Sequence, residues 1–341
     1  MKKILIIKPS GIGDIVHSLP VVYGLRELYP DSKIYWLVFT RFEKILHNIP
    51  QVDKLILWDR KGGLGEYIRV IKEIRQEQFD LVIDLQGLLR TAIISYFSGG
   101  KQRAGVSLLR EFAWLFEKPI EKFDPGMHAV DRNYRVVKYL GGPRALPEPS
   151  VYLPWMRFTD DEKQTAAEFL SVTNTNKKTS PEKPLVLFVA TSRGLHKVWP
   201  WQNFANLGNL LMSKYDITPV FLGMKGEEGY IYDITMNLRG EFIDLSGKTD
   251  LRTACAVISS CRLVIGNDTA LIHIAAALNV PVIGLYGATD PAQVGPYGEK
   301  NIVILNKLPC WPCGIKSNCR VNKCMMGIKP EDVFSAAKKY L

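Results

Sequence analysis

Short apolar runs alternate with segments of helical periodicity along most of the 341-residue chain. Runs such as KILIIKP at 3–9, LVIDLQ at 81–86 and LVLFVAT at 185–191 have strand length and are rich in β-branched residues. Strands that are buried on both faces of a parallel sheet have this near-continuous hydrophobic pattern, because helices cover the two faces. The alternation therefore predicts an α/β protein.

The apolar runs fall into two groups, which indicates two domains. Strands are expected at 3–9, 33–39, 54–59 and 81–86, and then at 185–191, 219–224, 242–247, 263–266, 281–287 and 302–306. Between the groups lies the polar, proline-containing segment TNTNKKTSPEKP, residues 173–184, which is typical of the approach to a second domain. We expect one domain at 1–170, a second at 171–329, and a C-terminal helix at 330–341.

The stretch GNDTALIHIAAALNVPVIGLYG, residues 266–287, is apolar enough to raise the alternative of a membrane span. His273, Asn279 and Pro281 interrupt it, which weakens that alternative. The stretch is better interpreted as a βαβ unit, with a strand at 263–265, a helix at 269–278 and a strand at 281–285. In such a unit the end of the first strand and the start of the helix face the ligand.

The helix start in this unit is a candidate site for a phosphate. We expect Asp268 to be the N-cap and Thr269 to begin the helix, whose free backbone N–H groups and positive dipole end suit an anion. His273 follows one turn later. A purely structural alternative stays open, in which Asp268 only caps the helix and His273 is a core histidine.

The first βα turn, KPSGIGDIVHSLP at 8–20, has glycines at Gly11 and Gly13 where the backbone must turn tightly. It matches the dinucleotide motif GxGxxG only in part, because Val16 replaces the third glycine and Asp14 stands in the turn. A carboxylate there repels a pyrophosphate but suits a hydroxyl, so Asp14 is a candidate general base. The alternative is an N-cap aspartate.

Two loops that follow strands of the second group carry further polar candidates. TSRGLHKVWP at 191–200 offers Arg193, His196 and Lys197 as cations for the phosphates of a leaving group. GMKGEE at 223–228 offers Glu227 as an acceptor for ribose hydroxyls. Each loop alone is equally consistent with a solvated turn, but together with the 266–287 helix start they predict a site at the carboxyl edge of the second sheet.

Four of six cysteines, Cys310, Cys313, Cys319 and Cys324, fall within CWPCGIKSNCRVNKC. In a cytoplasmic protein such a cluster is a candidate structural zinc or iron site, although only one CxxC is present, so free thiols in a tight loop are an equal alternative. Cys255 and Cys261 are expected in the core.

The net charge of +10 indicates an acidic partner: nucleic acid, anionic lipid or a phosphorylated substrate. No nucleic-acid-binding motif is present and the cations are spread along the chain, which favours a membrane surface or an anionic ligand over nucleic acid. The first apolar run, Ile4 to Ile7, is too short for the core of a signal peptide, so we expect a cytoplasmic location.

Several motifs together resemble one known family. GDIVHSLP near the start, LVIDLQGLLR at 81–90, HKVWP at 196–200, LSGKTDL at 245–251 and NDTALIHIAAALNVPVIGLYGATDP at 267–291 are similar to the lipopolysaccharide heptosyltransferases of glycosyltransferase family 9. The resemblance implies a GT-B fold, with two Rossmann-like domains facing each other across a cleft. It also implies inverting transfer of heptose from ADP-heptose to the inner core of lipopolysaccharide (Kdo-lipid A or heptosylated core), with no cofactor required for catalysis.

The resemblance also implies roles for individual residues. Asp14 matches the catalytic base, Lys197 the lysine on the donor diphosphate, and Glu227 a glutamate on the donor nucleotide. Asp268, Thr269 and His273 match the motif that holds the donor phosphates and sugar, with Thr191 and Arg193 as further donor-binding candidates. Ala270 departs from the family pattern, which usually has glycine there. In the N-terminal, acceptor-binding domain the candidates are Gly11, Gly13, Arg60, Lys61, Arg90 and Arg103.

This reading predicts an enzyme that works peripherally on the inner face of the inner membrane, where its basic surface meets the anionic acceptor. Three alternatives remain: a GT-B transferase that uses another sugar nucleotide, a nucleotide-sugar-binding protein without catalysis, and a nicotinamide-dependent oxidoreductase. The incomplete glycine motif and Asp14 in the turn argue against the last.

Overall fold

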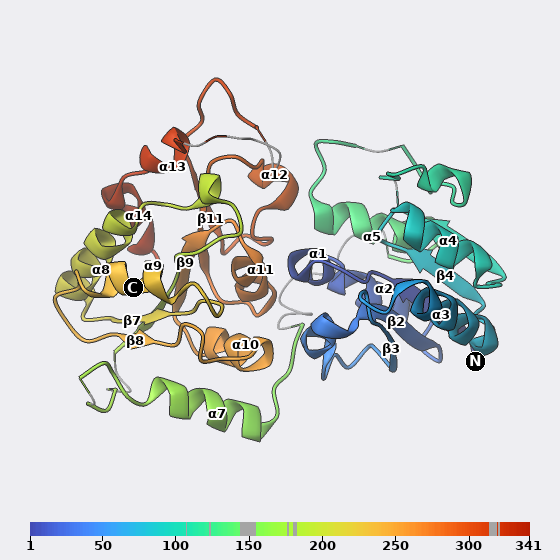
Figure 1. Ribbon diagram of the computed structural model, residues 1–341, viewed down its shortest axis with the longest axis horizontal. Helices are drawn as coiled ribbons and strands as arrows, with labels where there is room; N and C mark the ends of the chain where they lie inside the picture. Colours follow the sequence, from blue (N-terminus) through green and yellow to red (C-terminus); the bar gives the residue numbers. More distant parts are fainter. Residues whose placement is uncertain are drawn as a thin grey trace. The chain divides into compact units, whose positions relative to one another are not determined.

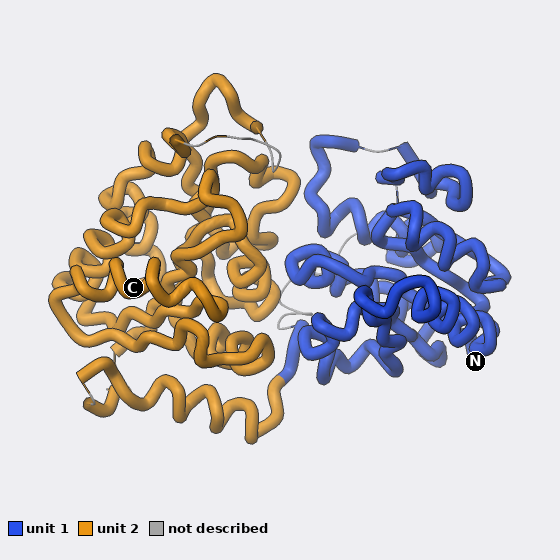
Figure 2. Tube along the Cα trace, viewed as in Figure 1, with its two compact units in different colours: residues 1–157 blue, residues 158–341 orange. Residues whose placement is uncertain are grey.

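The computed structural model describes residues 1–106, 108–122, 124–143, 155–175, 177–179, 183–313, 319 and 321–341. The chain forms two compact units, Met1–Arg157 and Phe158–Leu341 (Figure 2). Each unit contains one sheet in which all paired strands are parallel. The predicted α/β class is confirmed.

In its described residues, unit 1 has a five-stranded sheet with the order β3-β2-β1-β4-β5 (Figure 1). The strands are β1 (Lys3–Ile7), β2 (Lys33–Phe39), β3 (Lys54–Trp58), β4 (Leu81–Asp84) and β5 (Gln102–Gly105). The helices are α1 (Ile12–Val16), α2 (Leu19–Leu28), α3 (Gly63–Glu77), α4 (Leu89–Phe97) and α5 (Ala129–Tyr139), with the 3-10 helices η1 (Thr40–Leu46) and η2 (Ala113–Leu115). Nearly every residue of the central strands is buried, as the continuous apolar runs predict.

Unit 2 has a six-stranded sheet in its described residues, with the order β11-β10-β9-β6-β7-β8. Its strands are β6 (Leu185–Val189), β7 (Thr218–Phe221), β8 (Ile243–Asp244), β9 (Leu263–Asn267), β10 (Val282–Tyr286) and β11 (Ile302–Leu305). Its helices are α7 (Asp160–Leu170), α8 (Trp201–Tyr215), α9 (Glu228–Thr235), α10 (Leu251–Ser259), α11 (Ala270–Ala277), α12 (Pro291–Val294), α13 (Lys323–Met326) and α14 (Pro330–Ala337), with the 3-10 helix η3 (Leu195–Lys197).

Both sheets have the strand order of a doubly wound Rossmann-like fold. The chain begins at a central strand, β1 or β6, winds outward on one side, and then crosses back to the other side through β4 or β9. The loops that leave the two central strands therefore diverge at the carboxyl edge of the sheet, which is where such folds bind ligands. These switch points lie between β1 and β4 in unit 1 and between β6 and β9 in unit 2.

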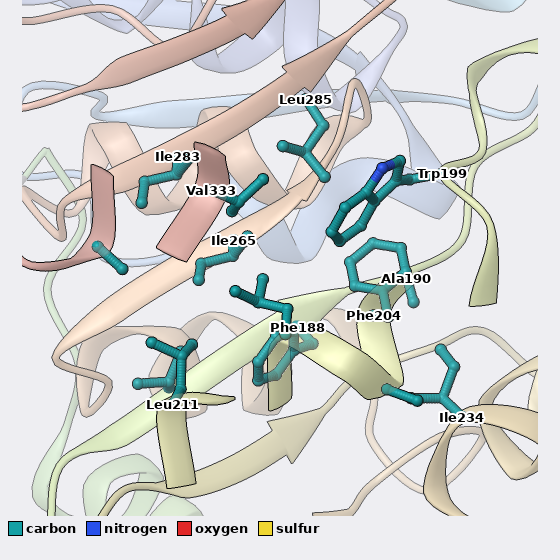
Figure 3. Packing of buried hydrophobic residues seen from close by; sticks show 14 of the residues in the cluster. Phe188, Ala190, Trp199, Phe204, Leu211, Ile234, Ile265, Ile283, Leu285 and Val333 are labelled. Carbon is teal, nitrogen blue, oxygen red and sulfur yellow. The ribbon is translucent and has the colours of Figure 1, made fainter. Parts of the chain in front are cut away.

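A hydrophobic cluster fills one side of the unit 2 sheet (Figure 3). Trp199, Phe188 and Phe204 are fully buried there, and the rings of Trp199 and Phe204 meet edge to face with centroids 4.8 Å apart. Residues of α14, including Val333 and Ala337, complete the cluster. The C-terminal helix, predicted at 330–341, is therefore an integral part of unit 2.

The division between the units falls after Arg157, at the N-terminal side of α7. This helix packs on α10, where Arg252 Nε donates to Glu162 Oε1 over 2.6 Å. Glu162 also accepts from the Thr159 backbone N–H, which closes a capping box at the helix start. The boundary expected at residue 170 coincides with the end of α7. Helix α7 makes its contacts within unit 2, so the division falls before this helix and not after it.

Each apolar run that predicts a strand contains one in the structure. The edge strand β5, with the sequence QRAG, was not predicted because it has no apolar run. Among the described residues, no helix combines the length and apolar character needed to cross a membrane.

Candidate active site

An ion pair joins two loops at the switch point of unit 2. Lys197, at the end of η3 in the loop after β6, places Nζ 2.5 Å from Oδ2 of Asp268, which follows β9 directly. Both side chains are mostly buried, with 16% and 8% of their surface exposed. The structure thus brings together two residues that the sequence analysis placed in separate candidate loops.

Asp268 is the centre of a polar cluster that also contains Lys197, His273 and Thr289, called here the Asp268 cluster. Thr289 Oγ1 donates to Asp268 Oδ2 over 2.6 Å, and His273 Nε2 lies 3.7 Å from Oδ1. Burial alone would raise the carboxyl pKa, but neighbouring His273 and Lys197 outweigh it and hold the pKa of Asp268 well below its usual value. The cluster therefore contains an ionised carboxylate.

The start of α11 differs from the prediction in its capping residue. Thr269, not Asp268, is the N-cap, and the helix runs from Ala270 to Ala277 rather than over 269–278. The Asp268 carboxylate instead accepts from Lys197 and Thr289. The Thr269 side chain makes no capping hydrogen bond either, within the part of the chain that the structure describes. Ala270 is the first helical residue, so a methyl group stands where the family pattern has glycine.

Trp199 anchors the loop that carries Lys197. Its backbone N–H donates to Asn267 Oδ1 over 3.0 Å, its indole Nε1 donates to the Ile328 carbonyl over 2.9 Å, and its own carbonyl accepts from Tyr230 over 2.6 Å. Asn267 in turn donates to the Ala190 carbonyl over 2.6 Å. These contacts fix the loop to β9 and to the core, and they limit the positions that Lys197 can take.

Sequence reasoning missed Asn267 and Thr289, which complete this arrangement. Thr289 lies in the loop just after β10, so the rule that strand ends face the ligand contained the signal that could have found it. The sequence pattern gives Asn267 no role of its own within the NDT motif.

Thr191 and Glu227 form a second contact at the same sheet edge. Thr191 Oγ1, after β6, donates to Glu227 Oε2 over 2.7 Å, and the Met224 backbone N–H donates to the same oxygen over 2.7 Å. Both bonds use Oε2 and leave Oε1 for other donors. Arg193, the remaining donor-binding candidate, is exposed in the loop before η3.

In unit 1, Asp14 lies at the switch point beside β1. It belongs to the short helix α1, and its side chain is exposed. Gly11 precedes this helix with φ 23°, and a Cβ there would lie 2.9 Å from Asp14 Oδ2. Gly11 therefore makes room for the carboxylate, and Gly13 forms part of the same helix. The structure thus presents Asp14 to solvent at the sheet edge where a ligand is expected.

Two buried charged groups that sequence reasoning missed lie under this turn. Lys8 Nζ is buried and donates to the Leu85 carbonyl over 2.7 Å, and burial lowers the pKa of Lys8 although the charges of Asp14 and Asp84 oppose it. Burial also raises the pKa of Asp84, at the end of β4, to about 6. Each of the two residues lies near the end of an apolar run, where a charged residue normally marks the end of a strand. The sequence pattern therefore gives no sign that they are buried.

The other acceptor-binding candidates of unit 1 occupy different kinds of position. Arg60 and Lys61 are exposed in the loop after β3, and Arg90 is the second residue of α4, so all three follow carboxyl strand ends. Arg103 lies inside β5 instead. Its guanidinium stacks over Tyr96 at 5.0 Å and donates to the Phe116 carbonyl over 2.9 Å.

The four clustered cysteines are not arranged as a metal centre. Cys310 and Cys319 are exposed, Cys313 is partly buried and Cys324 is buried. No group of three or more His, Cys, Asp or Glu among the described residues is placed to hold a metal ion, so the structure does not support a zinc or iron site. As predicted, Cys255 and Cys261 lie in the core, where burial raises the pKa of each thiol to about 12.

Comparison with known proteins identifies the family of the chain. A family model described as glycosyltransferase family 9 (heptosyltransferase) matches residues 67–324. A lipooligosaccharide heptosyltransferase 2 of Haemophilus ducreyi is 31% identical over 317 residues, which cover 89% of this chain and 88% of the relative.

Two solved structures show the same fold. A family 9 glycosyltransferase of Veillonella parvula has a TM-score of 0.83 at 23% identity and covers 99% of this chain and 97% of its own. An Escherichia coli heptosyltransferase solved with ADP-2-deoxy-2-fluoro heptose has a TM-score of 0.74 at 23% identity and covers 99% and 100%. The chain therefore belongs to glycosyltransferase family 9, the heptosyltransferases, and is a transferase enzyme with a GT-B fold.

Proposed function

We propose that this enzyme transfers a heptose from ADP-heptose to the inner core of lipopolysaccharide, with inversion at the anomeric carbon. Unit 2 binds the donor and unit 1 binds the acceptor. The observation that carries the proposal is the Asp268 cluster at the switch point of unit 2, combined with an exposed carboxylate, Asp14, at the corresponding point of unit 1. Membership of a heptosyltransferase family supports the choice of donor.

Lys197 is the residue that we propose for the donor diphosphate. An ammonium group has three N–H donors, and the bond to Asp268 uses one of them. The remaining two can bind phosphate oxygens, while Asp268 fixes the direction of the ammonium. When the glycosidic C–O bond breaks, its electron pair stays on the diphosphate oxygen, and a fixed cation stabilises the charge that develops there.

The start of α11 adds to this stabilisation. Backbone N–H groups in the first turn of a helix have no partner within the helix. Because Thr269 leaves its capping position without a side-chain bond in the described structure, those N–H groups suit a phosphate. The Ala270 methyl group lies at this position, and we propose that it sets how closely the backbone approaches the donor.

Glu227 is the residue that we propose for the nucleotide. Thr191 and the Met224 backbone hold its Oε2, which leaves Oε1 to accept a hydrogen bond from a ribose hydroxyl. Arg193, exposed in the neighbouring loop, and His273 complete the donor-binding set.

Asp14 is the general base in this proposal. It takes the proton of the acceptor hydroxyl while the hydroxyl oxygen forms its bond to the anomeric carbon, on the face opposite the departing ADP. The exposed position of Asp14 lets an acceptor hydroxyl reach it. Arg60, Lys61 and Arg90 are proposed to bind anionic groups of the acceptor, and the enzyme acts at the inner face of the inner membrane.

The test compares Asp14→Ala and Asp14→Asn with the wild type. We expect both variants to lose transfer by a factor of about 100 or more, because general-base catalysis contributes this much, and to retain ADP affinity measured by calorimetry. Asp31→Ala removes another exposed carboxylate of unit 1 and serves as the control. Full transfer by Asp14→Ala would remove this residue from the mechanism.

Two further measurements test the donor and the stereochemistry. Thermal shift should show stabilisation by ADP and ADP-heptose that exceeds stabilisation by UDP-sugars. NMR of the product should show an anomeric configuration opposite to that of the donor. Stronger stabilisation by a UDP-sugar would indicate a GT-B transferase with another donor, and ligand binding without any transfer would indicate a binding protein.

A further inference from the structure

Large apolar side chains are exposed together on one part of unit 1. Tyr96 and Phe97 end α4 with 51% and 44% of their surface exposed. Phe112, Trp114 and Leu115 of the η2 region are 66%, 62% and 59% exposed. We call these five residues the aromatic patch. Soluble proteins rarely gather this much exposed apolar surface unless it has a binding partner.

The patch is one connected surface. Helix η2 packs on α4, and Figure 1 shows it next to that helix. The Tyr96 ring lies 5.2 Å from the ring of Phe97 and 5.6 Å from that of Phe116, which follows η2 directly. Ala113 is buried and anchors the short helix.

The backbone before η2 holds Phe112 outward. Glu111 and Phe112 have φ of 54° and 63°, in the left-handed region that residues other than glycine rarely adopt. Residues held in sparsely populated backbone regions cluster at functional sites.

Charges around the patch select an anionic partner. Arg110 and Lys118, on either side of η2, are exposed, and Arg103 lies over the Tyr96 ring. The carboxylates nearby are largely engaged or buried: Glu117 is buried and Glu121 binds Arg135 over 2.5 Å. Glu111 is exposed. The exposed charges that flank η2 in the sequence are therefore mostly cationic.

We propose that the aromatic patch docks on a lipid surface with anionic headgroups, so that Trp114 and its apolar neighbours enter the interface and Arg110 and Lys118 meet lipid phosphates. Tryptophan and tyrosine favour the boundary between headgroups and acyl chains, and nearby cations add electrostatic attraction to anionic lipids. The inference deepens the proposed function and rests on it for one element, namely that the acceptor is carried by a membrane lipid.

Binding of the full-length protein to vesicles tests the proposal. The vesicles contain phosphatidylglycerol mixed with phosphatidylethanolamine, and vesicles of phosphatidylcholine alone provide the comparison. We expect the wild type to sediment with the anionic vesicles and to dissociate as salt is raised. The double variant Trp114→Ala/Leu115→Ala should bind about tenfold more weakly, and Arg110→Glu/Lys118→Glu should lose the preference for anionic lipid.

Tyr232→Ala is the matched control, because Tyr232 is 60% exposed but lies on α9 of unit 2. It should bind vesicles like the wild type. Thermal unfolding should show all variants folded, since every substituted side chain is exposed. Unchanged binding by Trp114→Ala/Leu115→Ala, or an equal loss in Tyr232→Ala, would overturn the proposal. The proposal would also be overturned if sedimentation velocity showed that the wild type is a dimer and that Trp114→Ala/Leu115→Ala is a monomer.

Transfer to a deacylated, soluble acceptor separates this inference from the proposed function. The double variant should retain that transfer while losing much of its transfer to vesicle-bound acceptor. If the wild type binds anionic vesicles through the patch but transfers no heptose to either acceptor, the proposed function fails and the docking surface stands.

Discussion

Lys197 and Asp268 form an ion pair of 2.5 Å between residues that are 71 positions apart in sequence. The pair joins the two loops that diverge at the unit 2 switch point, so the sheet topology itself brings the cation and the carboxylate together. Asp268 is held in turn by Thr289 and lies beside His273. The arrangement fixes the direction of one ammonium group at the edge where the donor is proposed to bind.

Replacing Lys197 by alanine should impair the enzyme through the leaving group. We expect kcat to fall by about 100-fold or more, because a preorganised charge on the developing diphosphate is lost. Steady-state kinetics with saturating acceptor would measure it. Lys214→Ala, which removes an exposed lysine in the last turn of α8, is the control. Equal kinetics for the two variants would contradict the role given to Lys197.

Asp268→Asn should lower stability in a manner that depends on pH. The variant leaves Lys197 without its ionised partner, and we expect the free energy of unfolding to fall by about 2–4 kcal/mol at pH 7. Because folding lowers the pKa of Asp268, its contribution is fully present above the ordinary pKa of about 4 and is lost as the pH falls below it.

Chemical denaturation of wild type and Asp268→Asn at several pH values would check this. The difference between them should be constant from about pH 8 to 5 and should shrink below about pH 4. A difference that grows toward low pH would have the wrong sign.

Trp199→Phe should show how firmly the Lys197 loop is anchored. Phenylalanine keeps an aromatic ring in the core but loses the bond from Nε1 to the Ile328 carbonyl, a loss of about 1–2 kcal/mol in unfolding free energy. Trp199→Ala also leaves a cavity, at a cost of about 3–5 kcal/mol. Urea denaturation would rank the variants, and a Trp199→Phe variant as stable as wild type would show that the hydrogen bond has no net effect.

Gly266→Ala should destabilise unit 2 strongly. Gly266 pairs with Val189 across β9 and β6, and a Cβ at Gly266 would lie 2.5 Å from the Val189 Cβ and 2.6 Å from its carbonyl oxygen. We expect the free energy of unfolding to fall by about 2 kcal/mol or more, because the backbone of the neighbouring strand must move.

Gly229→Ala is the matched substitution, since no atom would lie within 4 Å of the new Cβ in helix α9. It should be neutral or stabilise by about 0.5–1 kcal/mol, as alanine is the better helix former. Similar melting temperatures for the two glycine variants would refute the packing argument.

The strands and the local candidates could be predicted from the sequence because their signals are local. Apolar runs marked each predicted strand, and the strand-end rule selected Asp14, Lys197 and Asp268. β5 was missed because a short edge strand such as QRAG needs no apolar run. The sequence predicts an N-cap at Asp268 because that pattern is local, whereas the partners of its carboxylate, Lys197 and Thr289, come from other loops. Lys8 was missed because only tertiary packing decides that a lysine is buried.

The chain divides after Arg157, and helix α7 remains with unit 2 through the contact between Glu162 and Arg252. This makes residues 158–341 the natural piece to exchange between relatives. A chimera joined at that position keeps the α7–α10 contact within one sequence. One joined after residue 170 exchanges α7 for the relative's segment, which must then supply the partner of Arg252 and the side chains that pack on α10. Under the proposed function, recombination at the earlier junction would combine a new acceptor preference with an unaltered donor site.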